Sequence, residues 1–266
     1  QFMNTTETQA LPAPPNLIKA LLAGFDAVSN HIAVIFFPLA FDLLLWLGPH
    51  LRLKQLVQTI FRQAALIPEM KTPEMAEMLR SSQELWTRLV ERLNLFSLLR
   101  TMPIGIPSLM VRRSPVENPL GAAAGVEVTS FFGFAGLWLL LGLAGLILGA
   151  LYFSAVARVS LHRDLSWKAL LQDWPRVAGQ VLLLTLVWIL LILAVGLPFS
   201  CVFTVLMALG LQVQQLSVLL FGVLVVWMLL PLVFSPHGIF VYRLRIFESV
   251  KTGARLVRLT LPSTGL

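Results

Sequence analysis

The sequence predicts an all-α, polytopic integral membrane protein with about four transmembrane helices, interfacial amphipathic helices and one helical extracytoplasmic insertion. Its 266 residues are 57% hydrophobic and 12% charged, and this charged share is about half of the ~25% found in average soluble domains. Residues 177–236 contain no Lys, Arg, Asp, Glu or His, and neither do residues 131–157. Both runs exceed the roughly 20 apolar residues that a helix needs to cross hydrocarbon.

The positive charge of the chain borders its apolar runs. The formal net charge is +7 and the pI is near 10.3, values that in a soluble protein would suggest nucleic-acid binding. Apart from Lys19, however, every Lys and Arg lies outside the apolar runs. Contact with anionic headgroups accounts for this placement, at about 1 kcal/mol per basic residue. We therefore expect membrane lipids as partners and no nucleic acid.

The chain begins with a lead-in followed by a first apolar segment. Residues 1–15 contain three prolines and no signal-peptide pattern, so we expect a flexible N-terminal lead-in. Residues 16–49 are expected to form an interfacial helix and the first span. In residues 16–31, polar and apolar side chains occupy separate stripes of a helix. The span covers residues 32–47 and is expected to kink near Pro38.

Residues 50–130 are the one sizeable polar region, which we expect to be an extracytoplasmic helical insertion. A Thr-Pro pair at positions 72 and 73 is a favourable helix start. Apolar residues then recur at spacings of four and three, which predicts an amphipathic helix over 73–100. A second amphipathic segment at 53–61 completes an antiparallel helical hairpin. The proline-rich residues 101–125 are expected to return as an extended strap.

Residues 131–236 are expected to form a three-span membrane domain. Its first span, 131–157, contains three glycines at helical spacing. Because glycine has no side chain, such a stripe leaves a groove where another helix can approach closely. The glycines predicted to serve this packing are Gly142, Gly145 and Gly149.

The charge-free run divides into two parts at its one polar break, residues 210–215. A short surface helix capped by Ser166 is expected to precede the run. The first part, 177–210, is longer than a hydrocarbon core requires. Gly196 and Pro198 offer a place to kink, so we favour one kinked, protruding helix over a span followed by a re-entrant half-helix.

Orientation follows from the short basic segments. Residues 158–176 contain four Lys or Arg and residues 237–266 contain five, whereas 211–215 contain none. By the positive-inside rule, both basic segments face the cytoplasm. We therefore expect both termini to be cytoplasmic and the insertion to lie on the opposite side of the membrane.

A basic surface helix followed by a span recurs along the chain. The segment Lys19-Ala-Leu-Leu is repeated as Lys168-Ala-Leu-Leu, and each copy precedes a span. A third surface helix is expected to end at Arg258, followed by a tail too short for a span. Either the gene product continues into a further span or this repeat has lost it. The third helix directs Phe247, Val250, Ala254 and Val257 to one face, while membrane-surface contacts are expected from Lys168, Arg245, Lys251, Arg255 and Arg258.

Several of these segments resemble a known group of proteins. The residues concerned are Lys19-Ala-Leu-x-x-Gly-Phe25, Pro38, Asp42, Leu45-Trp-Leu-Gly-Pro49, Leu230-Pro-Leu-Val-Phe-Ser-Pro-His237 and Glu248-Ser-Val-Lys-x-x-x-Arg255-Leu-Val-Arg258. They resemble uncharacterised bacterial multi-span proteins related to the membrane region attached to some glycerophosphodiester phosphodiesterases. The resemblance covers about a quarter of the chain and implies no catalytic residues. The soluble phosphodiesterase barrel, with its acidic metal ligands, has no counterpart here.

Few residues are candidates for chemistry. Asp42 is the only acid within an apolar segment, where a carboxylate can be functional or can bond a neighbouring helix. His31 and His237 are weak candidates for binding a haem or a chlorophyll-type pigment, although interfacial histidines are more often plain polar groups. No two histidines have metal-ligand spacing, and no catalytic residue or cofactor is predicted.

The sequence favours a binding or structural role over catalysis. We expect a non-catalytic accessory or scaffold subunit of a larger membrane complex, with other membrane subunits as partners. The alternative is a transporter or a lipid-handling protein. Coupled transporters usually place ionisable groups near the membrane midplane, and the longest apolar run here has none.

Overall fold

The protein is built almost entirely of helices. A computed structural model describes residues 17–68, 72–91, 93–100, 104–108, 121, 124–162, 166–210 and 214–264, and it is 83% helical. Within the described residues, three stretches are long and apolar enough to cross a membrane. They are Phe131–Leu161 in α5 (Phe131–His162), the whole of α6 (Trp167–Ala208), and Leu216–Phe240, which runs through α7 (Gln214–Val233) and α8 (Ser235–Phe240). The all-α class is thereby confirmed, and the three helices are compatible with a membrane protein. The helix α2 (Ile32–Leu47) has only 16 residues, so a fourth span stays a prediction.

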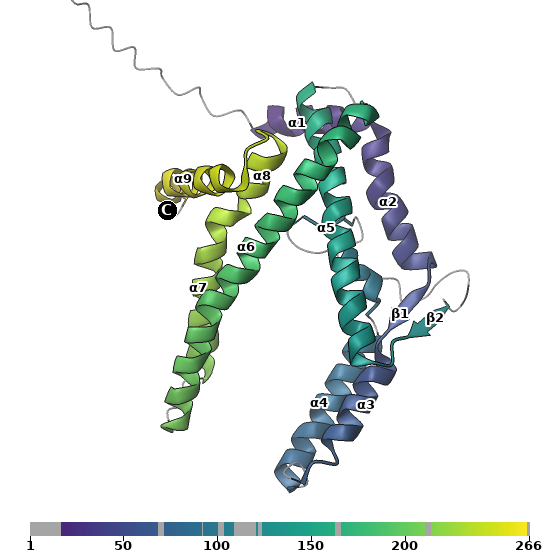
Figure 1. The fold of residues 1–266 in the computed structure, drawn as a ribbon, viewed down its shortest axis with the longest axis vertical. Coiled ribbons are helices and arrows are strands. Elements are labelled where there is room, and N and C mark those ends of the chain that lie inside the picture. The colour runs from purple at the N-terminus through teal and green to yellow at the C-terminus, as the bar shows by residue number, and fades with distance from the viewer. Residues whose placement is uncertain are drawn as a thin grey trace, which may run out of the picture.

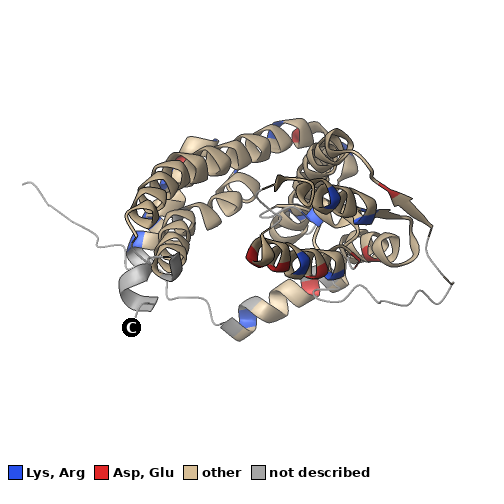
Figure 2. Ribbon diagram, turned by 90° about the horizontal axis from the view of Figure 1, so that it is seen from below, with Lys and Arg blue, Asp and Glu red and all other residues tan. Residues whose placement is uncertain are grey.

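The helices run between two ends of the molecule (Figure 1). One end, the α1 end, gathers α1 (Leu17–Ser29), the end of α5, the start of α6 and, slightly lower, α8 (Ser235–Phe240) and α9 (Ile246–Thr264). The other end, the hairpin end, holds the end of α6, the start of α7 and the helical hairpin of α3 (Lys54–Ala64) and α4 (Pro73–Glu91). In Figure 2, the hairpin carries both acidic and basic residues, whereas long stretches of the apolar helices carry neither.

A short sheet joins α2 to α5 at the hairpin end. Strands β1 (His50–Arg52) and β2 (Gly125–Glu127) pair in parallel, with Leu51 opposite Val126. The Nζ atom of Lys54 lies 3.0 Å from a carboxylate oxygen of Glu91, which closes the base of the hairpin. Sequence patterning does not predict this sheet, because each strand has only three residues.

The helix predicted over 73–100 is shorter than expected. The helix α4 ends at Glu91, and the 3₁₀ helix η2 (Leu95–Arg100) follows. The buried Asn94 explains the break, because its side-chain oxygen accepts hydrogen bonds from the backbone N–H groups of Leu51 and Phe96. An Asn that bonds nearby backbone competes with the helix ladder.

Residues 95–100 and 104–108 lie beside the middle of α5 rather than beyond its end. Leu95, Leu99 and Ile106 pack in a buried cluster with side chains of α2 and α5. The extracytoplasmic location predicted for 50–130 stays a prediction, but this segment packs against α5. The glycines of α5 explain why, because they let a backbone lie against the helix.

A single helix replaces two predicted elements in α6. The helix continues from Trp167 through Pro175, Gly196 and Pro198 to Ala208, so the separate surface helix is not present. Its 42 residues correspond to about 63 Å at 1.5 Å per residue. The structure thus agrees with one protruding helix rather than a half-helix. Ser166 occupies the N-cap position, but its side chain makes no capping hydrogen bond.

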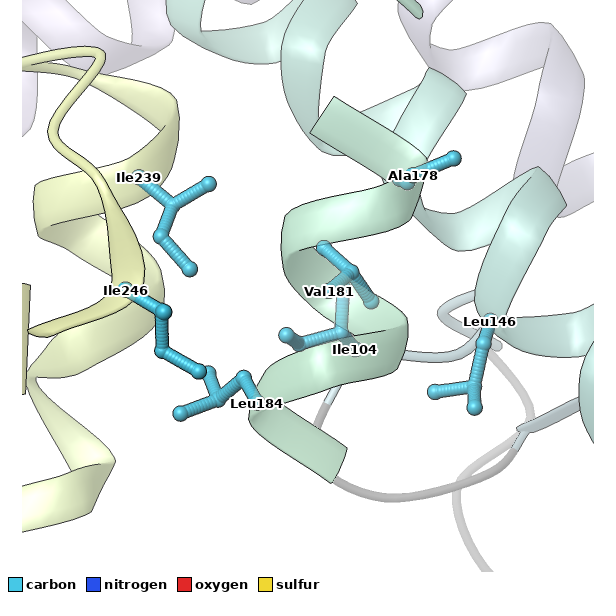
Figure 3. Close-up of a cluster of buried hydrophobic side chains, with 8 residues drawn as sticks. Ile104, Leu146, Ala178, Val181, Leu184, Ile239 and Ile246 are labelled. Carbon is cyan, nitrogen blue, oxygen red and sulfur yellow. The ribbon is translucent and has the colours of Figure 1, made fainter. Parts of the chain in front are cut away.

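The main core lies where α5, α6, α8 and α9 meet (Figure 3). Ile239 and Ile246 lie on one side of α6 and Leu146 on the other, while Ile104 lies beside Val181. The helix α9 extends to Thr264, beyond the predicted end at Arg258. Its face is also directed differently, because Val257 is buried in the chain while Phe247 is 80% exposed. Contacts with α7 and α8 cover part of the face expected to lie on the membrane.

Candidate ligand site between α5, α6 and α8

Charged side chains meet at the α1 end, where α5, α6 and the α8–α9 connection come together. A carboxylate oxygen of Asp173 accepts hydrogen bonds from the guanidinium groups of both Arg158 and Arg243, the latter at 2.8 Å. The guanidinium of Arg158 also donates to the carbonyl oxygen of Ala169 at 3.1 Å. One acid therefore ties three segments of the chain together.

The three arginines of this site differ in how tightly they are held. Arg158 is mostly buried, with 18% of its side chain exposed, whereas Arg243 is 57% exposed. Arg243 also has a left-handed backbone, with φ of 53°. Such a conformation costs about 1–3 kcal/mol in a residue other than glycine and persists where surrounding contacts hold it. Arg176 is exposed, and within the described residues it has no ion pair or hydrogen bond.

Other polar contacts fix the helices around the arginines. The indole N–H of Trp174 on α6 donates to the carbonyl oxygen of Ile147 on α5 at 2.9 Å. The side-chain oxygen of Gln180 accepts from the backbone N–H of Ile246 at 2.9 Å, which attaches the start of α9 to α6. These bonds hold the walls of the site in place.

Two hollows adjoin at this junction. The first, the arginine hollow, is a shallow depression of about 50 Å³ whose walls include Arg158, Asp173, Arg176 and Arg243. The second, the apolar pocket, measures about 570 Å³, within the usual range of ligand sites. The apolar pocket is lined by Ile104, Phe153, Val156, Ala157, Ser160, Leu161, Pro236, His237, Phe240, Val241 and Tyr242. Both hollows share Ala157, Leu161, Phe240 and Val241.

The histidines predicted as weak ligand candidates lie in different places. His237 lines the apolar pocket, and its ring lies 5.8 Å from the ring of Tyr242, centroid to centroid. His31 is half-buried between α1 and α2. Across the described ranges, no group of three or more His, Cys, Asp or Glu side chains could hold a metal ion.

Asp42 and the glycine stripe lie outside the two hollows. Asp42 is only 2% exposed and accepts a hydrogen bond from the hydroxyl of Ser108, which belongs to a non-helical segment rather than to a neighbouring helix. A Cβ on Gly145 would lie 2.5 Å from the carbonyl oxygen of Leu99, and one on Gly149 would overlap that of Ile104. The groove of the stripe therefore admits η2 and the segment after it, and Gly142 is half-buried.

The basic residues predicted for the membrane surface are at the α1 end. Lys168 is exposed in the first turn of α6, while Arg245, Lys251, Arg255 and Arg258 are exposed in or next to α9. Sequence reasoning missed Arg158, Asp173 and Arg243 as a group. One signal was available, because Asp173 is the only acidic residue between positions 165 and 247.

Comparisons with models of protein families, with curated proteins and with solved structures find no match to this chain. The resemblance to the membrane region attached to some phosphodiesterases therefore stays a prediction.

Proposed function

We propose that this protein handles membrane lipid, binding it where α5, α6 and α8 meet. The observation that carries the proposal is the apolar pocket of about 570 Å³ directly beside the arginine hollow. A lipid has the same two-part chemistry, a charged headgroup joined to apolar chains. The polar groups of the site support a binding role, because Arg158, Asp173 and Gln180 hold elements together.

The setting of the pocket also supports this function. The pocket lies near the end of α5, where an apolar stretch gives way to Arg158. In a membrane, such a boundary lies at headgroup depth, where basic residues attract anionic lipids. We place the protein in a bacterial cytoplasmic membrane, with the α1 end on the cytoplasmic side.

Retained lipid tests the proposal. The half-buried Val156 lines the apolar pocket, so Val156→Trp should fill the pocket and expel its occupant. We expect the wild-type protein to keep a bound phospholipid through detergent exchange and Val156→Trp to lose it, as measured by native mass spectrometry. Leu139→Trp is the matched control on the same helix, because Leu139 is 56% exposed and lies outside the pocket. Equal lipid retention in all three proteins would rule out the pocket as the binding site.

A second candidate function is that of a non-catalytic accessory or scaffold subunit. Its support is the exposure of the apolar helices. In the most apolar 18-residue stretch of each candidate span, only 17%, 11% and 6% is buried within the chain. Surfaces of that extent must be covered by lipid or by other membrane proteins. Helices associate in a membrane by close packing. Most side chains of α7 are exposed, so another membrane protein could pack against this helix.

Cross-linking distinguishes lipid from protein as the neighbour of the exposed apolar helices. A photoreactive amino acid at Val226, which is 62% exposed on α7, should form a discrete adduct with another membrane protein in intact cells. The same group at Lys251, which is exposed on α9, is the control outside the apolar surface. If Val226 yields only lipid adducts, the accessory-subunit candidate is lost.

A further inference from the structure

The arginine hollow carries more positive charge than its own chain neutralises. Its described lining contains Arg158, Arg176 and Arg243 but only one acid, Asp173. At neutral pH these four side chains leave a net charge of two positive units. We propose that the hollow binds the phosphate of an anionic phospholipid whose acyl chain enters the apolar pocket. This inference rests on the proposed lipid-binding function and adds the class of lipid.

The two exposed arginines are the groups available to a phosphate. Arg158 is committed to Asp173 and to the carbonyl oxygen of Ala169. Arg176 has no ion pair or hydrogen bond in the described part of the chain, and Arg243 shares its acceptor with Arg158. Guanidinium groups present paired N–H donors that match phosphate oxygens. Arg176 and Arg243 can therefore turn donors towards a headgroup while Arg158 keeps the walls together.

The same set of groups disfavours a zwitterionic headgroup. The ammonium of such a lipid is stabilised by a nearby negative charge, and the one carboxylate in the described lining, that of Asp173, is already paired with two arginines. An ammonium would also meet the positive charges of Arg176 and Arg243 at close range. Charge therefore selects against it, and selects for lipids with a net negative headgroup.

The position of the hollow selects a lipid over free phosphate. Ala157 and Leu161 on α5 and Phe240 and Val241 near the end of α8 belong to both hollows. A phosphate at the arginines thus has an apolar pocket as its immediate neighbour. Burial of acyl methylenes in that pocket contributes favourable binding free energy, which inorganic phosphate cannot gain.

The test compares two lipids that differ only in headgroup. The full-length protein in mild detergent is titrated with phosphatidylglycerol and with phosphatidylcholine of the same acyl chains, and bound lipid is counted by native mass spectrometry. We expect phosphatidylglycerol to bind the wild-type protein more tightly. The double variant Arg176→Gln/Arg243→Gln should lose roughly 30-fold in affinity for phosphatidylglycerol at low salt, the usual effect of two basic residues at a headgroup.

Two variants control for charge and folding. Arg255→Gln/Arg258→Gln removes the same charge from exposed positions of α9 and should keep the preference for phosphatidylglycerol. Arg176→Gln alone breaks no contact within the described residues, so it keeps the fold and should still lose about fivefold. If the α9 variant loses as much as the hollow variant, general surface charge is responsible and the proposed site is wrong.

The remaining outcomes separate this inference from the proposed function. Equal binding of both lipids to the wild-type protein overturns the anionic class and leaves lipid binding intact. Binding of neither lipid overturns both. Inorganic phosphate at the concentration of the lipid should not displace it, and displacement would identify free phosphate as the ligand.

Discussion

At Gly149 the absence of a side chain is a steric requirement. The backbone of Ile104 and Gly105 lies where a Cβ of residue 149 would stand, and Leu99 takes the same place at Gly145. Neither contact involves a positive φ, so close approach alone accounts for both glycines. The stripe was predicted from spacing, but the chain segment that fills its groove was not.

Gly149→Ala is therefore expected to lower the free energy of unfolding by about 1–3 kcal/mol, because the added methyl group overpacks the contact with Ile104. Gly136→Ala on the same helix is the control. Nothing lies within 4 Å of its added Cβ, so the variant should be neutral or up to about 1 kcal/mol more stable. Thermal unfolding in detergent measures both, and equal melting of all three proteins would mean that the segment does not touch α5.

The residues of the ligand site show where sequence reasoning stops. Charge counting predicted cations at this boundary, since it needs only their positions along the chain. The pairing of Asp173 with Arg243 joins residues 70 positions apart, and no local pattern encodes such a contact. Arg158 was visible as the first charge after an apolar run, but its role depends on where α6 packs.

At the scale of elements, the apolar runs predicted the presence of the helices better than they predicted where each helix begins and ends. The helices α5 and α7 follow from long charge-free stretches, whereas α6 begins about ten residues before its stretch because charged residues are compatible with a helix. The end of α4 depended on the hydrogen bonds of Asn94 to distant backbone. The direction of the α9 face depended on α7 and α8, which cover it where a membrane was expected. Tertiary contacts determine these helix ends and the direction of the α9 face. The spacing of apolar residues along the sequence carries no information about such contacts.

At the scale of the whole molecule, the arrangement of ends bears on membrane topology. The α1 end collects the surface helices and most of the basic residues outside the hairpin, and the hairpin lies at the opposite end (Figure 1). This pairing of ends is compatible with the alternation of sides predicted from short-loop charge, but it leaves the absolute direction open. The direction still rests on the positive-inside rule.

Cysteine labelling tests the direction. In a Cys201→Ser background, Gln83→Cys on α4 and Gln172→Cys on α6 each place a thiol at an exposed position. An impermeant thiol reagent added to intact cells should label residue 83 and leave residue 172 unlabelled, and both should react after lysis. The reverse pattern would invert the proposed orientation.

The packing of η2 and residues 104–108 against α5 also has a consequence for biosynthesis. The segment leaves the ribosome before α5, yet Gly145 and Gly149 of α5 provide the surface on which it rests. Irregular backbone such as that of residues 104–108 cannot enter hydrocarbon unless protein surrounds it, so in a membrane these residues must stay in water until α5 has been inserted. The segment is therefore made before α5 but can pack only after α5 is in place. A chain whose synthesis stalls before α5 would leave the segment without the surface on which it packs.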